Sequence, residues 1–216
     1  MLPTPSHNLW PPPHTDASLC QDLSRSSHLH ANVCPRLRDG GEHFSQVYRQ
    51  LNPNAVVPTL VDQGVAINQS IAIIEYLDEV YPDIRLLPND HIKRAQVRAI
   101  ALTIACDIHP LQNMRVLKYL GNEFGFSDDQ KNDWYRHWVS QGLASIETMV
   151  AKLGHTSFCY GQTPGLADIC LIPQLFNARR VQVDLSVMPN LLRIEGNCLN
   201  LLAFQEAAPA KQIDAE

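Results

Sequence analysis

The spacing of apolar residues in the first third of the chain predicts a short hairpin followed by a helix. Thr59-Leu60-Val61 and Val65-Ala66-Ile67 are two runs of β-branched and apolar residues. The turn signal Asp62-Gln63-Gly64 lies between them, so we expect two antiparallel strands joined by a tight connection. Ser70 precedes a helical pattern and is the expected N-cap; the apolar residues of this pattern are Ile71, Ile74 and Leu77.

From Asp90 onward, apolar residues recur with the three- and four-residue spacing of amphipathic helices. Asn89 or Asp90 is expected to cap the first helix, whose apolar stripe comprises Ile92, Ala95, Ala99, Leu102 and Cys106. His109 and Asn113 continue this stripe, and Pro110 is expected to kink the helix between them. A lone histidine on such a face is usually a packed core residue. A polar pair beside a proline kink favours a cleft wall instead.

Three further helices are indicated in the second half of the chain. Ser127 and Gln130 have the spacing of a capping box. Gly165, with Asp168 three residues later, is expected to open a buried helix. The last helix is expected to run from near Pro189 to Phe204, followed by a polar tail.

The composition is that of an ordinary globular protein. A chain of 216 residues with 45% hydrophobic and 18% charged residues can form one large or two small domains. A formal net charge of −5 argues against a nucleic-acid partner. No apolar run approaches the roughly 18 residues of a membrane span, and no signal-peptide pattern opens the chain. Six cysteines without a C-x-x-C pair are expected to be reduced thiols. Together, these observations predict a cytoplasmic protein without a membrane partner. No metal site is expected.

Residues 1–37 differ in composition from the rest of the chain. They contain six prolines, four histidines and five serines, but no Ile, Phe or Tyr. Because they show no apolar period, we expect this segment to be disordered. A glycine turn after Arg38 leads into a short helical piece around Phe44, Val47 and Tyr48. An extended linker between Tyr81 and Asp90 is expected to separate two domains, residues 38–83 and residues 90–216.

The Val57-Pro58 pair before the hairpin, with Gln69-Ser70 at the start of the following helix, resembles the glutathione-binding half of the glutathione transferases. The resemblance implies a cis Val57-Pro58 peptide and a Val57 backbone that pairs with the backbone of glutathione. It also implies that Gln69-Ser70 binds the γ-glutamyl carboxylate, which helix N-termini attract through N–H groups and the helix dipole. An isolated Gln-Ser pair is usually an ordinary cap. Here the whole arrangement favours a binding site.

A second string, DIHPLQNMRVL from Asp107 to Leu117, resembles the zeta class of this family, the maleylacetoacetate isomerases. The resemblance implies a thioredoxin-like α/β N-terminal domain, incomplete in its first third, and an all-helical C-terminal bundle. It implies a glutathione site that includes His109 and Asn113-Met114-Arg115, with His43 as a further polar contact. The string Asn177-Ala-Arg179-Arg180 is compared with an Asn-Ala-x-Arg pattern of the class. The comparison implies that Arg180 holds a substrate carboxylate, since guanidinium groups pair bidentately with carboxylates. A solvated pair of arginines is the alternative.

The resemblance implies an enzyme with glutathione as its cofactor and a dicarboxylate as its small-molecule substrate. The thiolate of glutathione adds to the cis double bond of maleylacetoacetate, rotation follows, and the thiolate leaves to give fumarylacetoacetate. This reaction belongs to the degradation of tyrosine, phenylalanine or related aromatic compounds. A homodimer is expected if the N-terminal domain is complete.

One part of the class pattern is missing. The class takes its thiol donors from a Ser-Ser-x-x-x-Arg-Val-Arg motif, which this sequence lacks, so no catalytic residue is assigned. The resemblance covers roughly residues 38–208, and without an inner strand the Thr59–Ile67 hairpin is expected to have an unpaired edge. Two hypotheses follow. The chain is an isomerase whose recorded N-terminus is wrong or altered, or it is a non-catalytic or impaired glutathione-transferase-like protein.

Overall fold

The computed structural model describes residues 30–32, 41–83 and 85–211. The chain divides into two compact units, residues 1–84 together with 201–216, and residues 85–200. The change from one unit to the next at residue 84 falls in the proline-marked segment between Tyr81 and Asp90. The three-part division expected from the sequence, 1–37, 38–83 and 90–216, stays a prediction.

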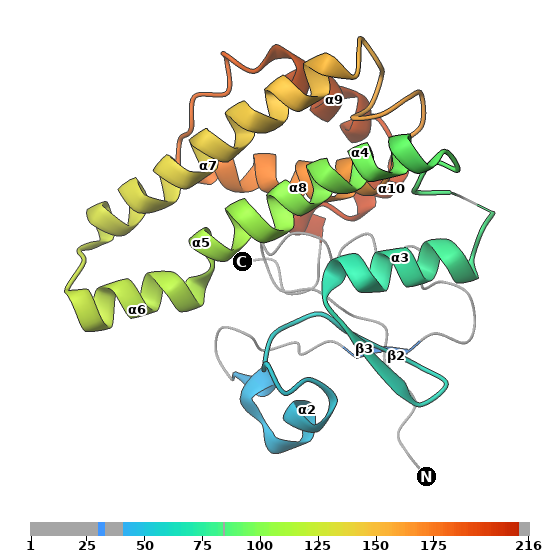
Figure 1. The fold of residues 1–216 in the computed structure, drawn as a ribbon. Helices are drawn as coiled ribbons and strands as arrows, with labels where there is room; N and C mark the ends of the chain where they lie inside the picture. Colours follow the sequence, from blue (N-terminus) through green and yellow to red (C-terminus); the bar gives the residue numbers. More distant parts are fainter. Residues whose placement is uncertain (1–29, 33–40, 84, 212–216) are drawn as a thin grey trace. The chain divides into compact units, whose positions relative to one another are not determined.

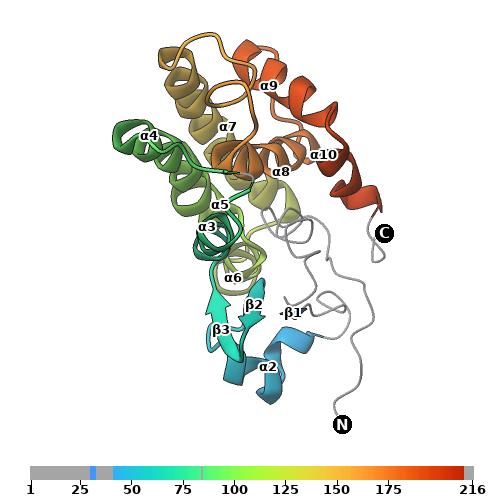
Figure 2. The same cartoon turned by 90° about the vertical axis from the view of Figure 1, so that its right-hand side faces the viewer.

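The first unit contains a three-stranded antiparallel sheet in the order β1-β2-β3, formed by β1 (His30–Asn32), β2 (Thr59–Asp62) and β3 (Val65–Asn68). Figure 1 labels β2 and β3, and Figure 2 labels all three strands. Thr59 lies opposite Asn68, and Asp62 lies opposite Val65. The two-residue Gln63-Gly64 connection has φ angles of 49° and 81°. Two positive φ angles are typical of the type I′ turn that matches strand twist. The predicted hairpin is therefore confirmed.

The edge of β2, expected to be unpaired, carries a third strand. β1 runs antiparallel to β2, with Asn32 opposite Thr59 and His30 opposite Val61. A strand edge offers backbone N–H and C=O groups to any extended segment. His-Ala-Asn can therefore join the sheet without the apolar periodicity on which the sequence argument depended. The disorder expected for the rest of the N-terminal segment, residues 1–29 and 33–37, concerns residues outside those that the structure describes.

Hydrogen bonds organise the chain before β2. This region contains the 3₁₀ helix η1 (Glu42–Phe44) and α2 (Gln46–Leu51), as the sequence predicted. The Tyr48 hydroxyl and the Asn52 side-chain amide both donate to the Val56 carbonyl, each at 2.7 Å. These bonds hold the loop that precedes Val57-Pro58, whose peptide bond is cis, as the resemblance implied. The hairpin is followed by α3 (Ser70–Val80), and the unit also contains α10 (Leu202–Glu206) and η3 (Pro209–Lys211).

The second unit is helical. Its elements are α4 (His91–Leu102), the π-helical segment η2 (Thr103–Ile108), α5 (His109–Gln112), α6 (Met114–Phe124), α7 (Asp128–Lys152), α8 (Leu166–Arg180) and α9 (Pro189–Leu199). α8 contacts α4, α7 and α9 (Figures 1 and 2), and its side chains Leu166, Ile169, Leu171 and Leu175 are almost fully buried. α8 is therefore the centre of this unit's core.

The face of α4 that was expected to be buried is exposed. The predicted stripe of Ile92, Ala95, Ala99, Leu102 and Cys106 faces outward, and Ile92 is 73% exposed. A second apolar row at helical spacing is buried instead, formed by Val97, Ile100, Ala101, Ile104 and Ile108. Larger side chains bury more apolar area than alanines do. The row rich in valine and isoleucine therefore faces the core.

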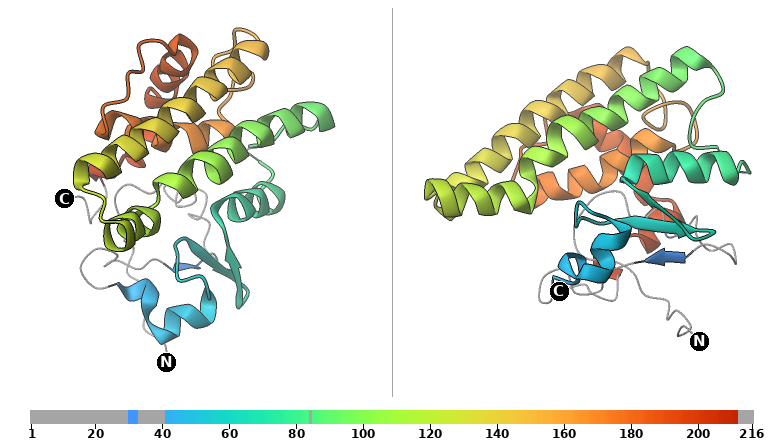
Figure 3. Two further views of the ribbon diagram at one scale, coloured as in Figure 1. Left: turned by 60° about the vertical axis from the view of Figure 1, so that its left-hand side comes forward. Right: turned by 60° about the horizontal axis from the view of Figure 1, so that its bottom comes forward.

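The helix expected to continue to Asn113 is interrupted there. The chain widens into the π-helical η2 before Pro110, and α5 ends at Gln112. Asn113 has an extended backbone (φ −62°, ψ 142°) and caps α6 by accepting a 3.0 Å bond from the Arg115 N–H. Proline lacks the N–H that a regular α-helix needs, and asparagine is a preferred N-cap. The chain changes direction at this point (Figures 1 and 3).

The predicted caps of α4 and α7 are confirmed. Of the two candidates for α4, Asp90 is the cap and accepts a 2.9 Å bond from the Lys93 N–H. Ser127 and Gln130 form the predicted capping box of α7. The expected final helix is divided, because α9 ends at Leu199 and α10 begins only at Leu202.

Candidate functional site

Four of the predicted binding residues lie in the first unit. Val57 precedes β2, while Gln69 and Ser70 follow β3. Because Thr59 pairs with Asn68, the loop that contains Val57 and the start of α3 lie at the same end of the hairpin. His43 lies in η1, where its ring packs against Phe44 with 3.9 Å between centroids.

The prediction that Ser70 is the N-cap of α3 is wrong. The last residue with a non-helical backbone is Gln69, which is therefore the N-cap, and Ser70 is the first helical residue. The Gln69 carbonyl accepts the first intrahelical bond, 3.0 Å from the Ile73 N–H. Gln69 has φ 76° and ψ 120°, an uncommon backbone conformation for a residue with a side chain. Such strain concentrates at ligand-binding sites. Within the described residues, no side chain caps the first turn of α3, so its N–H groups suit an anionic ligand group.

The predicted residues of the second unit cluster at the break between α5 and α6. His109 begins α5 and is half-buried, Asn113 caps α6, and Met114 and Arg115 are exposed in its first turn. Burial lowers the pKa of His109, and the positive charge of Arg115 lowers it further. A histidine with a lowered pKa is neutral at pH 7. His109 can therefore offer a hydrogen bond without adding a positive charge.

The two arginines at the end of α8 have different partners. Arg179 forms an ion pair with the Glu195 carboxylate of α9, which is largely buried. Arg180 is exposed, and within the described part of the chain no carboxylate lies within ion-pair distance of it. Of the two, Arg180 is the arginine that can accept an external carboxylate. The Arg136 side chain fixes this helix end, since its Nε donates a 2.9 Å bond to the Val181 carbonyl.

Several residues near these positions escaped the sequence analysis. Tyr135 on α7 is half-buried; burial raises its pKa to about 12, and the positive charge of nearby Arg180 acts in the opposite direction. Gln112, next to Asn113, exchanges two hydrogen bonds with Gln174 of α8. No motif marks Tyr135. Gln174 could have been found as a polar residue in a segment that is otherwise apolar, whereas Gln112 lies among other polar residues.

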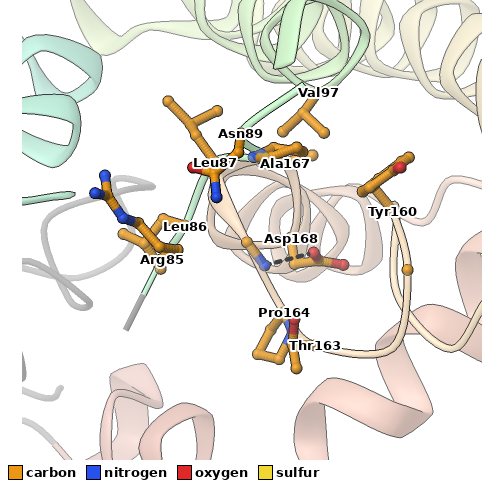
Figure 4. Close-up of a pocket in the computed structure, with 13 residues that line it drawn as sticks. Arg85, Leu86, Leu87, Asn89, Val97, Tyr160, Thr163, Pro164, Ala167 and Asp168 are labelled. Carbon is orange, nitrogen blue, oxygen red and sulfur yellow. Dashed lines mark hydrogen bonds between the residues drawn. The ribbon is translucent and has the colours of Figure 1, made fainter. Parts of the chain in front are cut away.

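A cavity in the second unit lies away from these residues. It has a volume of about 240 Å³ between residues 85–89 and the start of α8 (Figure 4), and none of the predicted site residues lines it. The Leu86 carbonyl there accepts a 3.0 Å bond from the Leu166 N–H. The Asp168 carboxylate accepts bonds from the N–H groups of Cys159 (2.8 Å) and Gly165 (2.9 Å). The chain thus satisfies these buried polar groups itself, which indicates a structural role.

Comparison with known proteins identifies the family. Residues 28–80 match the sequence model of the glutathione S-transferase N-terminal domain, and residues 132–203 match that of the C-terminal domain. A probable maleylacetoacetate isomerase from Vibrio cholerae is 46% identical over 180 residues, which cover 82% of each chain. The holo structure of a maleyl pyruvate isomerase, a bacterial zeta-class glutathione S-transferase, is 38% identical with a TM-score of 0.84 and covers 92% of this chain and 93% of that one. The chain belongs to the zeta class of the glutathione S-transferases.

Among zeta-class relatives, glutathione is a bound ligand. The structure of a maleylacetoacetate isomerase from Anaeromyxobacter dehalogenans with glutathione in its active site is 38% identical, with a TM-score of 0.71 and 81% coverage of both chains. The predicted family and the predicted fold, a thioredoxin-like domain followed by a helical domain, are confirmed. The family match begins at residue 28, earlier than the resemblance at Arg38. The binding roles of individual residues stay predictions.

Two further properties concern the described part of the chain. None of its helices combines the length and apolar character that a membrane span requires. It contains no group of three or more His, Cys, Asp or Glu side chains arranged to hold a metal ion.

Proposed function

We propose that this chain catalyses the glutathione-dependent cis–trans isomerisation of maleylacetoacetate to fumarylacetoacetate. The observation that carries the proposal is the 46% identity to a probable maleylacetoacetate isomerase over 82% of both chains. The substrate is a dicarboxylate, and the exposed Arg180, without a carboxylate partner in the described residues, is suited to bind one of its two carboxylates.

Glutathione, as cofactor, supplies the thiolate that adds to the substrate's double bond and later leaves. The residues of this chain fit it. The uncapped start of α3 at Gln69-Ser70 suits the γ-glutamyl carboxylate, and the Val57 backbone is assigned to the peptide backbone of glutathione. By the resemblance, His109, Asn113, Met114 and Arg115 are also assigned to glutathione, and His43 is assigned as a further polar contact.

Within this assignment, neutral and positively charged side chains have different roles. His109 is uncharged at pH 7, because burial lowers its pKa. Its assigned role is to orient glutathione through a hydrogen bond. Arg115 and Arg180 supply the positive charges for a ligand and a substrate that both carry carboxylates. Tyr135, protonated throughout the physiological range, adds a neutral donor near Arg180.

A second candidate function is an impaired glutathione-binding protein. It is favoured by the missing Ser-Ser-x-x-x-Arg-Val-Arg motif, since the class takes its thiol donors from it. Turnover of maleylacetoacetate by the full chain, with and without added glutathione, separates the two functions, provided that glutathione affinity is measured calorimetrically on the same sample. Glutathione-dependent turnover supports the isomerase. Binding of glutathione without turnover supports the impaired protein.

For the quaternary structure, we infer a homodimer that uses the exposed face of α4. This face consists of the exposed residues Ile92, Ala95, Ala99 and Leu102, followed by the exposed Cys106 of η2, and exposed apolar patches are typical of protein interfaces. A twofold dimer would pair the face with its own copy. Ile92→Asp should shift the mass measured by light scattering toward the monomer. Val187→Asp, at a residue with a similar exposure of 69%, is the matched control and should leave the mass unchanged.

A cytoplasmic location is part of the same proposal. Its support is the state of the cysteines: Cys106, Cys159, Cys170 and Cys198, which lie in the described residues, are free thiols. Free thiols in a protein of this size are typical of reducing compartments. Fractionation of cells that express the chain, followed by immunoblotting, tests the location.

A further inference from the structure

The segment that carries His109 is a helix too short to be stable alone. α5 has four residues, follows the π-helical η2, and ends at Gln112, directly before Asn113, whose backbone is extended. Isolated helices shorter than about 12 residues are marginal in water, because nucleation is unfavourable. Contacts with neighbouring elements must therefore set the position of α5.

Three contacts from α7 and α8 hold this segment. Ile108, directly before α5, packs onto Gly142 of α7, where an added Cβ would lie 2.3 Å from Ile108 Cδ1. The Trp134 indole donates a 2.7 Å hydrogen bond from Nε1 to the Leu111 carbonyl. The third contact comes from α8 and reaches Gln112. Consecutive parts of the segment are thus fixed by packing, by a backbone bond and by a side-chain pair.

The Gln112–Gln174 pair is buried and reciprocal. Gln112 Nε2 donates to Gln174 Oε1 at 2.6 Å, and Gln174 Nε2 donates back to Gln112 Oε1 at 3.1 Å. The two residues are 4% and 0% exposed. Two antiparallel amide bonds can form only when the two side chains have one relative orientation, and buried polar groups left without partners are costly. The pair therefore fixes the rotation of α5, which apolar side chains of similar size would not define.

The same pair joins α5 to the helix that carries Arg180. Gln174, Asn177 and Arg180 recur every three residues, so they lie along one ridge of α8. Gln174 and Asn177 are buried, and Arg180 is exposed at the helix end. The amide pair thus fixes the α5 segment relative to the ridge that ends at the arginine.

We propose that Gln174, through its reciprocal amide pair with Gln112, is a positioning residue that orients α5 so that His109 and Asn113 can bind glutathione. The inference rests on the proposed glutathione site. Gln174 itself touches neither glutathione nor substrate in this scheme, because its amide is occupied by Gln112.

The first test is Gln174→Asn in the full chain. Asparagine keeps the amide but is one methylene shorter, so the reciprocal bonds cannot both form. We expect the glutathione Kd, measured by calorimetry, and the glutathione KM to rise about tenfold. The kcat at saturating glutathione should stay within about twofold, since the lost interaction acts on cofactor binding in ground and transition states alike. The Kd, KM and kcat are measured well below each variant's melting temperature, so that the protein stays folded.

Two variants separate positioning from stability. Ile194→Val, at a fully buried position on α9, should lower the melting temperature and leave the glutathione Kd unchanged. The double variant Gln112→Leu/Gln174→Leu removes both polar partners together, so it should recover stability. Its glutathione Kd should nevertheless remain raised, because the leucines do not define the orientation of α5. Recovery of both stability and affinity would overturn the inference.

His109→Ala distinguishes failure of this inference from failure of the site. If His109→Ala raises the glutathione Kd and Gln174→Asn does not, the site stands and the positioning role is overturned. If neither variant changes the Kd, or if the unaltered chain binds no glutathione, the proposed site and the inference both fail. A rise in both variants, without a rise in Ile194→Val, supports the inference.

Discussion

Ser70 opens α3 without capping it, and this separates its two possible roles. Its side chain makes no capping bond in the described structure, so Ser70→Ala should change the unfolding free energy by less than about 0.5 kcal/mol. A bond to the glutathione carboxylate would contribute about 1.5–3 kcal/mol to binding. Calorimetric titration with glutathione and thermal melting measure the two effects.

Ser45 is the matched control for Ser70. Its hydroxyl caps α2 by accepting a 3.2 Å bond from the Tyr48 N–H. Ser45→Ala should therefore cost about 1 kcal/mol of stability and leave glutathione affinity unchanged. The opposite pattern, with stability lost in Ser70→Ala and affinity intact, would make Ser70 an ordinary helix-start residue.

Arg179 and Arg180 are adjacent, which makes each the control for the other. Arg180→Ala should raise the KM of the dicarboxylate substrate about tenfold or more, because the proposed charged pair between Arg180 and a substrate carboxylate is lost. The glutathione Kd should stay unchanged. Arg179→Ala should instead lower thermal stability, since it leaves the largely buried Glu195 carboxylate without its partner. Steady-state kinetics with each ligand varied in turn test this. Equal loss of substrate and glutathione binding in Arg180→Ala would remove Arg180 from the substrate site.

His109 should make stability depend on pH. Its pKa is lowered in the folded chain, so the unfolded chain binds the proton more tightly. Protonation of His109 therefore does not lower the free energy of unfolding at pH values above the unfolded pKa of about 6.5. The free energy of unfolding declines as the pH falls below that value. His109→Gln keeps a hydrogen-bonding side chain without this titration. Urea unfolding between pH 7.5 and 5 should show a shallower decline for the variant, and an unchanged slope would contradict the assignment.

At the scale of elements, the sequence predicted what neighbouring residues decide. The hairpin, the Asp90 cap and the Ser127 box depend on residues within a few positions of one another, and all are confirmed. The buried face of α4 was wrong because two apolar rows share the helix, and only packing against α8 selects one. β1 was missed because a short edge strand is held by backbone bonds, which carry no sequence pattern.

The start of α8 shows how packing overrides a local preference. Serine caps helices better than glycine, yet a Cβ at Gly165 would lie 2.6 Å from the Leu86 carbonyl oxygen. Gly165→Ser should therefore destabilise the fold by about 1–3 kcal/mol, because the backbone of residue 86 must move. Denaturant unfolding measures this. Gly154→Ser would be a poor control because its φ is 93°, whereas Gly196→Ser, with no atom within 4 Å of the added Cβ, is suitable. A more stable Gly165→Ser protein would show that the two segments separate freely.

At the scale of the whole molecule, the sequence predicted the residues of the candidate site more readily than the residues that hold them in position. The motif around His109 and the Asn-Ala-Arg-Arg string could be compared with a family pattern. Gln112 and Gln174 are far apart in the chain, and their pairing depends on how α5 and α8 pack. The choice between Arg179 and Arg180 likewise gained its structural support from Glu195, which lies on another helix.

The thiol chemistry is a property of the whole chain. A free thiol has a pKa of about 8.5, so only about 3% is thiolate at pH 7. The class lowers this pKa with a serine and arginine motif that the sequence lacks. None of the residues assigned to glutathione in this chain is assigned to its thiol. We therefore expect the isomerisation rate of the 216-residue chain, at saturating glutathione and substrate, to keep rising between pH 6 and 9 with an apparent pKa near that of the free thiol.

Initial rates across this pH range, with the intact mass of the chain confirmed, test that expectation. Thiolate formation limits the rate in this case, so each pH unit below the pKa should lower the rate about tenfold. A rate that is already constant from pH 7 upward would contradict the prediction. It would mean that the thiol of bound glutathione is already ionised at pH 7, and that the chain contains a donor able to stabilise the thiolate in place of the missing motif.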